Sequence, residues 1–437
     1  MSIFLYENKK ATINEKLIIN KNDVEDPSEF ESLYLYNYGD EFFSSLEELD
    51  DFYLVPSNSI FKLQIEDLKD ERTKKDIEPI LEFNGKLRPE QLEAIRPFFP
   101  NGIGMRGLRS GLLQAPCGWG KTFAACSLIA EASLTTLVIV HTKLLFYQWI
   151  DELKKLIPNQ EIGMIGDGKF NVKPITVAIY KSANNNLEAI KNEFSLVIVD
   201  EAHLCPAETF SETVNNLNSR YKIAITATPA RKDGHHLVLP DYFGDKLVVA
   251  KDSRKLADCH FEIVKTEIPF MIFNINRDWT AKLSELGENT KYLTLIAEKA
   301  KEKINEGRCL LILSERVSML KELLKLIPDS KLLIGETPQT ERDKILGAAG
   351  KEVKAILTTK IFDEGISCHR LDTIFLTCPN NNPIKLEQRV GRIIRLHPDK
   401  KDPLIVDFWL RGHIVQAQQS KRIQWYLVKG FKPIEPI

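Results

Sequence analysis

From residue 111 onward, short apolar runs alternate with longer stretches in which apolar residues recur every three or four positions. Continuous apolar runs of this length are typical of strands buried on both faces, and the longer stretches are typical of helices. The runs lie at residues 111–113, 136–140, 175–179, 195–199 and 221–225, with helical stretches at 122–132 and 143–156. This alternation predicts an α/β domain with a mostly parallel sheet, whose ligands bind at the carboxyl ends of the strands.

A second set of apolar runs follows in the C-terminal half. These runs lie at residues 310–313, 331–334, 355–359 and 373–377, with a helical stretch at 317–327. They predict a second α/β domain. Residues around 250–290, which include Trp279, Asn289 and Lys291, carry no nucleotide-binding motif, and we interpret them as the passage from the first sheet to the second.

Residues 1–85 have a different pattern, in which short aromatic and β-branched runs are separated by acidic turns. This pattern predicts a few strands in a small α+β domain. We therefore expect three parts: a small α+β N-terminal domain over 1–85, an ATP-binding α/β domain over 86–255, and a second α/β domain over 256–437.

Composition narrows the class of protein further. Of the 437 residues, 43% are hydrophobic and 27% are charged, which is typical of a soluble globular protein. We find no apolar run of membrane-spanning length and no secretory signal at the N-terminus, so we expect no membrane partner. The seven cysteines are odd in number and have no CxxC spacing, which indicates reduced thiols in a cytoplasmic compartment.

Charge is unevenly distributed along the chain. Residues 1–85 carry a net charge of −11, whereas the whole chain carries −2, so the rest is basic overall. A basic balance is expected of a nucleic-acid binder, and the acidity of the first 85 residues argues against a phosphate-binding surface there.

A glycine-rich turn between the first strand and the first helix is the strongest chemical motif. Glycines allow backbone amides to curl around phosphates, a lysine neutralises the β and γ charges, and a following hydroxyl can bind Mg²⁺. This loop begins at Ala115, where the strict pattern has glycine. The predicted ATP-binding residues here are Pro116, Cys117, Gly118, Trp119, Gly120, Lys121 and Thr122, of which Lys121 is also catalytic and Thr122 also a metal ligand.

Upstream of this loop, residues 87–95 have the pattern of an amphipathic helix. Arg88 and Gln91 lie three positions apart on one face, and the Gln91 amide could hydrogen bond to both edges of an adenine ring. A solvated helix start is the alternative interpretation.

Polar residues follow two further strands. Asp200 ends one strand and is placed to hold Mg²⁺ through water, and the adjacent Glu201 can orient or deprotonate the attacking water. His203 could couple this site to Thr226 and Thr228, which follow the next strand. Alternatively, the acidic pair could simply cap a helix.

Two basic stretches lie near the C-terminus. Residues 388–395 contain Arg389, Arg392 and Arg395 at a spacing of three, which suits guanidinium groups that stabilise the charge on a transferring phosphoryl group, or a basic surface helix. Residues 416–430 combine charge and aromatics in a pattern that fits either a nucleic-acid face or a closing helix packed on the second domain.

In this order, the segments resemble the superfamily 2 helicases and translocases over about residues 86–430. The amino-acid sequences of residues 226–234 and 388–397 are most similar to those of the XPB-like and UvsW-like enzymes. This group includes enzymes that remodel forks and Holliday junctions. The matching motifs are Arg88 with Gln91, 115–122, His141 and Thr142 with the helix after them, 180–182, 200–203, 226–229, 311–317, 358–367 and 388–395.

The resemblance implies two RecA-like domains, with ATP and Mg²⁺ as cofactors. It implies that Arg392 and Arg395 are arginine fingers, that Gln388 senses the nucleotide, and that Gly365 lies beside the ribose and phosphates. Strand phosphates would be held by Thr142, Lys143, Tyr180, Lys181, Ser182, Thr358 and Thr359. The chain departs from the pattern at Ser367, where aspartate is common, and at Trp119, where a small residue is usual.

We therefore expect an ATP-dependent DNA helicase or translocase that remodels branched DNA and acts as a monomer in the cytoplasm, or in the host cytoplasm if phage-encoded. An RNA helicase, a duplex DNA translocase serving a restriction or defence system, and a nucleotide-dependent scaffold on branched DNA are the alternatives.

Overall fold

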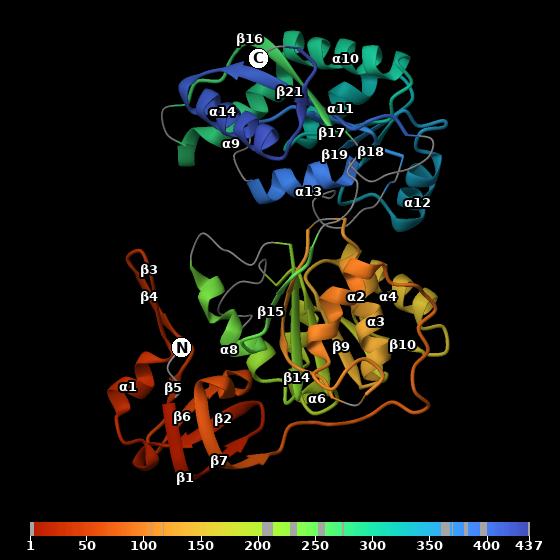
Figure 1. Ribbon diagram of the computed structural model, residues 1–437. Helices are drawn as coiled ribbons and strands as arrows, with labels where there is room; N and C mark the ends of the chain where they lie inside the picture. The colour runs from red at the N-terminus through yellow and green to blue at the C-terminus, as the bar shows by residue number, and fades with distance from the viewer. Residues whose placement is uncertain are drawn as a thin grey trace. The chain divides into compact units, whose positions relative to one another are not determined.

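The computed structural model divides the chain into two compact units, Met1–Ser253 and Arg254–Ile437 (Figure 1). It describes residues 4–105, 107–116, 118–202, 213–227, 234–251, 258–272, 275–359, 368, 370–379, 383–393 and 400–435. Each unit is built around a large sheet of its own, and both sheets are mostly parallel. The predicted α/β class with two parallel-sheet domains is therefore confirmed. No helix in the described ranges is long and apolar enough to cross a membrane.

The N-terminal part of the first unit is the predicted small α+β region. Its sheet has the order β5 (Glu47–Glu48), β6 (Phe52–Pro56), β2 (Lys16–Asn20), β1 (Phe4–Ile13) and β7 (Leu63–Asp70). A core that includes Ile13, Leu17, Phe30 and Val55 lies between this sheet and α1 (Pro27–Ser32). A separate two-stranded ribbon, β3 (Leu35–Tyr38) with β4 (Glu41–Ser44), extends from this region towards α8 (Leu239–Phe243) (Figure 1).

The large sheet of the first unit has eight strands, and its central strands carry the candidate site. All neighbouring strands are parallel except β10 and β11. The carboxyl ends of β13, β14 and β8 therefore lie next to one another at Asp200, Thr226 and Gln114. In sheet order the strands are β11 (Lys169–Asn171), β10 (Ile162–Gly166), β12 (Ile175–Ile179), β9 (Thr136–Val140), β13 (Leu196–Asp200), β14 (Tyr221–Thr226), β8 (Gly111–Gln114) and β15 (Leu247–Val249).

Helices cover both faces of this sheet, which explains why its strands are continuously apolar. In β9, Val138 and Val140 belong to one core, whereas Leu137 and Ile139 belong to the core on the other face. The first core includes residues of α2 (Pro89–Ile95), α3 (Lys121–Ala132) and α4 (Lys143–Leu156). The second includes residues of α5 (Tyr180–Asn185), α6 (Leu187–Ile190) and α8.

The second unit has a seven-stranded parallel sheet, and three of its strands, β16 (His260–Pro269), β21 (Leu404–Arg411) and β22 (Lys432–Pro433), are not among the apolar runs that predicted it. β16 (His260–Pro269) lies between β21 and β22, although we interpreted this region as a passage between sheets. Glu262, Lys265 and Glu267 interrupt its apolar pattern. The order is β18 (Ser330–Leu333), β19 (Ala355–Thr358), β17 (Leu310–Leu313), β20 (Thr373–Leu376), β21 (Leu404–Arg411), β16 and β22 (Lys432–Pro433).

The C-terminal helix of this unit packs on its sheet, as the closing-helix interpretation of residues 416–430 predicts. It is α14 (His413–Val428), which lies against β21. Arg422 is buried and donates to both carboxylate oxygens of Asp407 at 2.8 and 2.6 Å, and the Tyr426 hydroxyl donates to the same carboxylate at 2.9 Å. The remaining helices are α9 (Ile275–Glu288), α10 (Thr290–Asn305), α11 (Val317–Leu326), α12 (Gln339–Ala348) and α13 (Pro383–Ile393).

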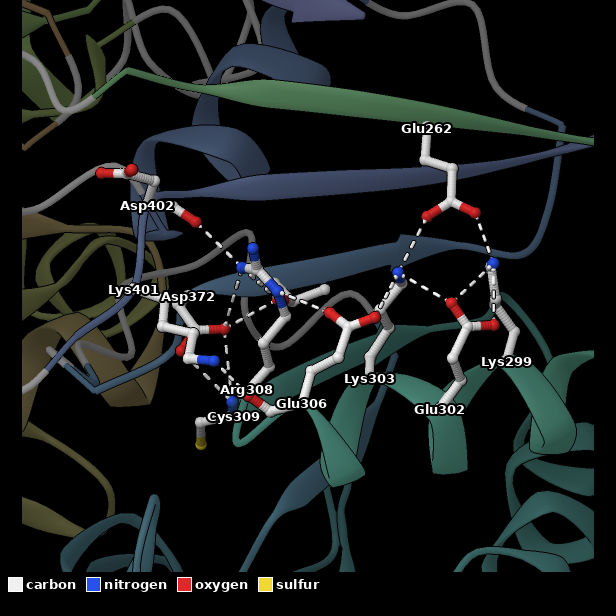
Figure 2. Close-up of polar contacts among 11 residues, drawn as sticks. Glu262, Lys299, Glu302, Lys303, Glu306, Arg308, Cys309, Asp372, Lys401 and Asp402 are labelled. Carbon is white, nitrogen blue, oxygen red and sulfur yellow. Dashed lines mark hydrogen bonds and ion pairs between the residues drawn. The ribbon is translucent and has the colours of Figure 1, made fainter. Parts of the chain in front are cut away.

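A network of ion pairs attaches α10 to β16 (Figure 2). Glu262 of β16 pairs with Lys299 at 2.5 Å and with Lys303 at 3.2 Å, and both lysines also pair with Glu302 at 2.9 Å. Burial lowers the pKa of Lys303, but its hydrogen bonds to Glu302 and Glu306 outweigh this and leave that pKa raised. The network therefore fixes the polar side of α10 on the strand that begins the second unit.

Candidate nucleotide site

The glycine-rich loop joins β8 to α3 as the sequence predicted. Gly118 and Gly120 have φ angles of 74° and 92°, in the left-handed region that favours glycine. A Cβ atom on Gly120 would lie 2.7 Å from the Gln91 amide nitrogen, so the Gln91 side chain would have to move to make space for it. Lys121 is the first residue of α3, where free backbone amides favour an anion. Cys117 lies outside the described residues.

The structure explains the bulky residue in this loop. Trp119 is completely buried, and its indole nitrogen donates to the Lys251 carbonyl at 2.9 Å, just after β15. Its own carbonyl accepts hydrogen bonds from Gln91 Nε2 at 3.1 Å and from Arg88 Nη2. Trp119 therefore anchors the middle of the loop to two other elements of the first unit.

The structure places Arg88 and Gln91 beside the loop. The sequence predicted these two residues only as a pair that contacts adenine. Gln91 is buried, and its Oε1 accepts from the Arg88 backbone amide at 3.0 Å. Since its Nε2 is bonded to Trp119, the amide supports the shape of the loop. Direct reading of adenine by this pair stays a prediction.

Acidic residues face the loop from the end of β13. Glu201 Oε1 lies 3.3 Å from Lys121 Nζ, and the Glu201 backbone has a left-handed φ of 50°. Asp200 is 4% exposed. Burial, followed by the charge of Glu201, raises the pKa of Asp200 to about 6, although Lys121 and two hydrogen bonds oppose the shift.

Two residues of this site were not identified as such from the sequence. Trp149 of α4 donates its indole N–H to Asp200 Oδ2 at 2.8 Å. His141 follows β9, and the Glu201 charge acts on it, although burial dominates and lowers the pKa of its imidazole. The sequence indicated His141 only as part of a motif shared with helicases, and nothing in the sequence indicated Trp149.

The other predicted residues near this edge are partly described. Thr226 is buried at the end of β14, and its carbonyl accepts from the Ala115 amide at 2.9 Å, which ties β14 to the start of the loop. His203 and Thr228, predicted to couple the site, lie outside the described residues.

The predicted nucleic-acid residues of the first unit flank the same edge. Thr142 caps α4 by accepting from the Leu145 amide at 3.2 Å, and Lys143 pairs with Asp167 at 2.6 Å on the surface. Lys181 is exposed and Ser182 is half-buried, whereas Tyr180 is buried.

In the second unit, the predicted residues are described only in part. Thr358 is completely buried at the end of β19 and Thr359 is half-buried, so only Thr359 has side-chain surface for a ligand. Gln388 and Arg392 lie on α13, but their side chains, like Gly365 and Arg395, are outside the described part. Arg389 is buried, so it does not project to solvent as a surface helix would require.

The geometry fits ATP with Mg²⁺. Lys121 and the free backbone amides at the start of α3 supply positive charge for phosphates. The pKa of Asp200 is raised because the carboxylate is buried beside the negative charge of Glu201. A divalent cation would neutralise this charge. Thr122 and Asp200 are the residues that would hold the metal. Among the described residues, no cluster of three or more metal-binding side chains indicates another metal site.

Comparisons with known proteins agree with this geometry. Residues 84–231 match the family described as the res subunit of type III restriction enzymes, and residues 290–397 match the helicase conserved C-terminal domain. The probable helicase D10 of Escherichia phage T5 is 30% identical over 331 residues, which cover 74% of this chain and 73% of D10.

Two further proteins are similar to the chain. The DNA 3'-5' translocase XPB2 of Sulfurisphaera tokodaii is 25% identical over 76% of this chain and 84% of its own. The crystal structure of T4 UvsW aligns with 97% of this chain and 98% of its own at 16% identity and a TM-score of 0.40. With the phosphate-binding loop and the acidic pair in place, the chain belongs to the superfamily 2 helicases, is related to XPB, and is an ATP-hydrolysing enzyme.

Proposed function

We propose that this enzyme is a DNA helicase or translocase that remodels branched DNA, such as forks and Holliday junctions. One observation carries the proposal. The nucleotide site lies at the edge of a sheet, and beside it α4 begins at Lys143, with Thr142 as its cap and Lys143 on the surface. The name of XPB2 as a DNA 3'-5' translocase supports DNA over RNA as the substrate. The motif sequences that the chain shares with fork-remodelling enzymes support branched DNA as the substrate.

The proposed ATP reaction begins with the pair between Lys121 and Glu201. Phosphates entering the loop compete with Glu201 for Lys121, because the ammonium lies only 3.3 Å from the carboxylate. Glu201, once released, orients the attacking water and accepts its proton. Thr122 and Asp200 would hold Mg²⁺, which would neutralise the β and γ charges of the nucleotide.

Other residues complete the proposed cycle. Arg392 and Arg395 stabilise charge on the γ-phosphoryl group in the transition state, and Gln388 and Gly365 contact the nucleotide. His203, Thr226 and Thr228 couple the phosphate site to strand movement. Strand phosphates are held by Thr142, Lys143, Lys181, Ser182 and Thr359, with Tyr180 and Thr358 contributing backbone groups, which positions a strand independently of its sequence. We propose that one chain suffices and acts in the cytoplasm, or in the host cytoplasm if it is phage-encoded.

The test is steady-state ATPase activity with single-stranded, duplex, forked and four-way-junction DNA, and with RNA, paired with strand displacement from the same substrates. We expect forks and junctions to stimulate most and to be resolved into products. Equal stimulation by plain duplex without displacement would identify a duplex translocase, and stimulation by RNA alone would identify an RNA helicase. Tight junction binding without strand movement would identify a scaffold.

Lys121→Ala is the matched control for the ATP site. We expect it to abolish turnover while it leaves DNA binding largely intact, since Lys121 lies at the phosphate loop and not on the α4 surface. Normal ATPase activity in this variant would contradict the site.

A further inference from the structure

Trp149 connects the core of the first unit to the metal-binding acid. It lies in α4, is 1% exposed, and belongs to the core on one face of the sheet. Its indole N–H points out of that core and donates to Asp200 Oδ2 at 2.8 Å. A buried indole N–H normally has a partner, but the partner here is a carboxylate of the nucleotide site.

Both oxygens of Asp200 are held by protein donors from different elements. Oδ2 accepts from Trp149 of α4, and Oδ1 accepts from the Glu201 backbone amide at 2.9 Å. Two donors on opposite oxygens fix the rotation of the carboxylate plane, whereas one donor would leave it free to turn. The direction of the remaining lone pairs is therefore set before any ligand arrives.

The chemistry of the donor suits a metal-binding acid. An indole N–H is neutral, so it orients the carboxylate without cancelling its charge. A lysine or arginine in this place would neutralise Asp200 and compete with a cation. The positive charge that acts on Asp200 is that of Lys121, which is itself paired with Glu201 at 3.3 Å.

We propose that Trp149 is a positioning residue for the ATPase reaction, which holds the Asp200 carboxylate in the orientation that Mg²⁺ and its water ligands require. This inference rests on the proposed role of Asp200 in holding Mg²⁺. Through Trp149, α4 becomes part of the nucleotide site. In the sequence α4 lies between the phosphate loop and the acidic pair, and that position does not reveal this role.

The test is Trp149→Phe, which keeps an aromatic ring in the core and removes only the donor. Nucleotide binding is measured by the anisotropy of a fluorescent ATP analogue, with EDTA and across a Mg²⁺ titration, alongside the Mg²⁺ dependence of ATPase activity. We expect unchanged binding in EDTA and a Mg²⁺ half-saturation about 10-fold higher in both assays, since groups that orient metal ligands typically contribute this much. Half-saturation equal to that of the wild type would overturn the proposal.

Trp409→Phe is the matched control. The Trp409 indole nitrogen is also buried but has no hydrogen-bond partner among the described residues, so its loss removes an N–H without freeing a carboxylate. We expect wild-type Mg²⁺ dependence in this variant. If Trp149→Phe does not fold, benzothienylalanine at position 149 keeps the bicyclic shape and replaces the N–H with sulfur, and the same two outcomes apply.

Asp200→Ala separates this inference from the proposed function. Normal ATPase activity in Asp200→Ala would contradict the proposed site itself. An inactive Asp200→Ala together with wild-type Mg²⁺ dependence in Trp149→Phe would contradict only the role of Trp149.

Discussion

Two buried aspartates in the first unit, Asp200 and Asp241, have opposite surroundings. Asp241 of α8 is completely buried and pairs with Lys62 at 2.6 Å, and it accepts from the Tyr36 and Ser45 hydroxyls at 2.5 Å each. All three partners come from the N-terminal 85 residues. Asp200 accepts its hydrogen bonds from an indole and a backbone amide, which are neutral, and its pKa is raised to about 6.

The difference separates a structural carboxylate from one prepared for a ligand. Burial lowers the pKa of Lys62, and the charge of Asp241 opposes that shift. Burial and the Asp241 charge also raise the pKa of the Tyr36 hydroxyl, so it remains a donor. Asp241 is thus matched in charge and joins the N-terminal region to the ATPase region, whereas Asp200 retains a negative charge that only a cation can match.

Asp200→Asn is the change with the largest expected effect on activity. We expect the ATPase kcat to fall by about 100- to 1,000-fold or more, because the charge that holds Mg²⁺ is lost. The free energy of unfolding should stay the same or rise, since a buried charge beside Glu201 is removed. Steady-state kinetics measures the change in kcat, and urea unfolding measures the change in the free energy of unfolding. A variant less stable than the wild type would contradict the contrast between Asp200 and Asp241.

Asp241→Ala is expected to have the opposite profile. Removing the carboxylate leaves Lys62 buried without its counter-ion, which should lower the free energy of unfolding by about 3 to 5 kcal/mol. ATPase activity per folded molecule should be retained at low temperature. The double variant Lys62→Met with Asp241→Leu should recover most of the stability, as urea unfolding would show, because it removes both charges.

The pH dependence of stability sharpens the comparison. Burial raises the pKa of Asp200 from 3.8 to about 6, so between these values the folded protein binds a proton that the unfolded chain has lost. The free energy of unfolding therefore falls as pH rises through this window and remains lower at pH 7. The gain of Asp200→Asn over the wild type should be near zero at pH 4 and about 2 to 3 kcal/mol at pH 7, measured by unfolding in EDTA.

Lys143→Ala should have the smallest effect on stability, since its partner Asp167 is at the surface. The pair at 2.6 Å is exposed to solvent, so its loss should change the free energy of unfolding by about 0.5 kcal/mol or less. Affinity for DNA should fall, and the salt dependence of log K should weaken by about one unit if Lys143 contacts a phosphate. An unchanged salt slope in a binding titration would remove Lys143 from the proposed DNA surface.

The sequence predicted the elements best where burial on both faces left a continuous apolar pattern. The bounds of β9 and α4 agree with those expected for residues 136–140 and 143–156. β16 was missed because Glu262, which pairs with α10, and the charged Lys265 and Glu267 interrupt the apolar pattern of a buried strand.

For the site, local motifs were predictable and contacts between distant segments were not. The strand, loop and helix around Lys121 follow from one stretch of sequence. The bonds of Trp119 to Arg88 and Gln91, and of Trp149 to Asp200, depend on how separate elements meet in the sheet, which no spacing records. The same holds for Arg422, whose burial depends on Asp407 opposite it.

The position of β16 has a mechanical consequence for a motor. The chain enters the second unit through this strand, which has β21 on one side and β22 on the other. A force directed along β16 would load its ladder of hydrogen bonds with β21 in shear, so that they share the force. A strand pulled sideways from an edge would instead open one bond at a time. β16 is thus held in its sheet by an arrangement that resists a pull along its own axis better than a pull from the side.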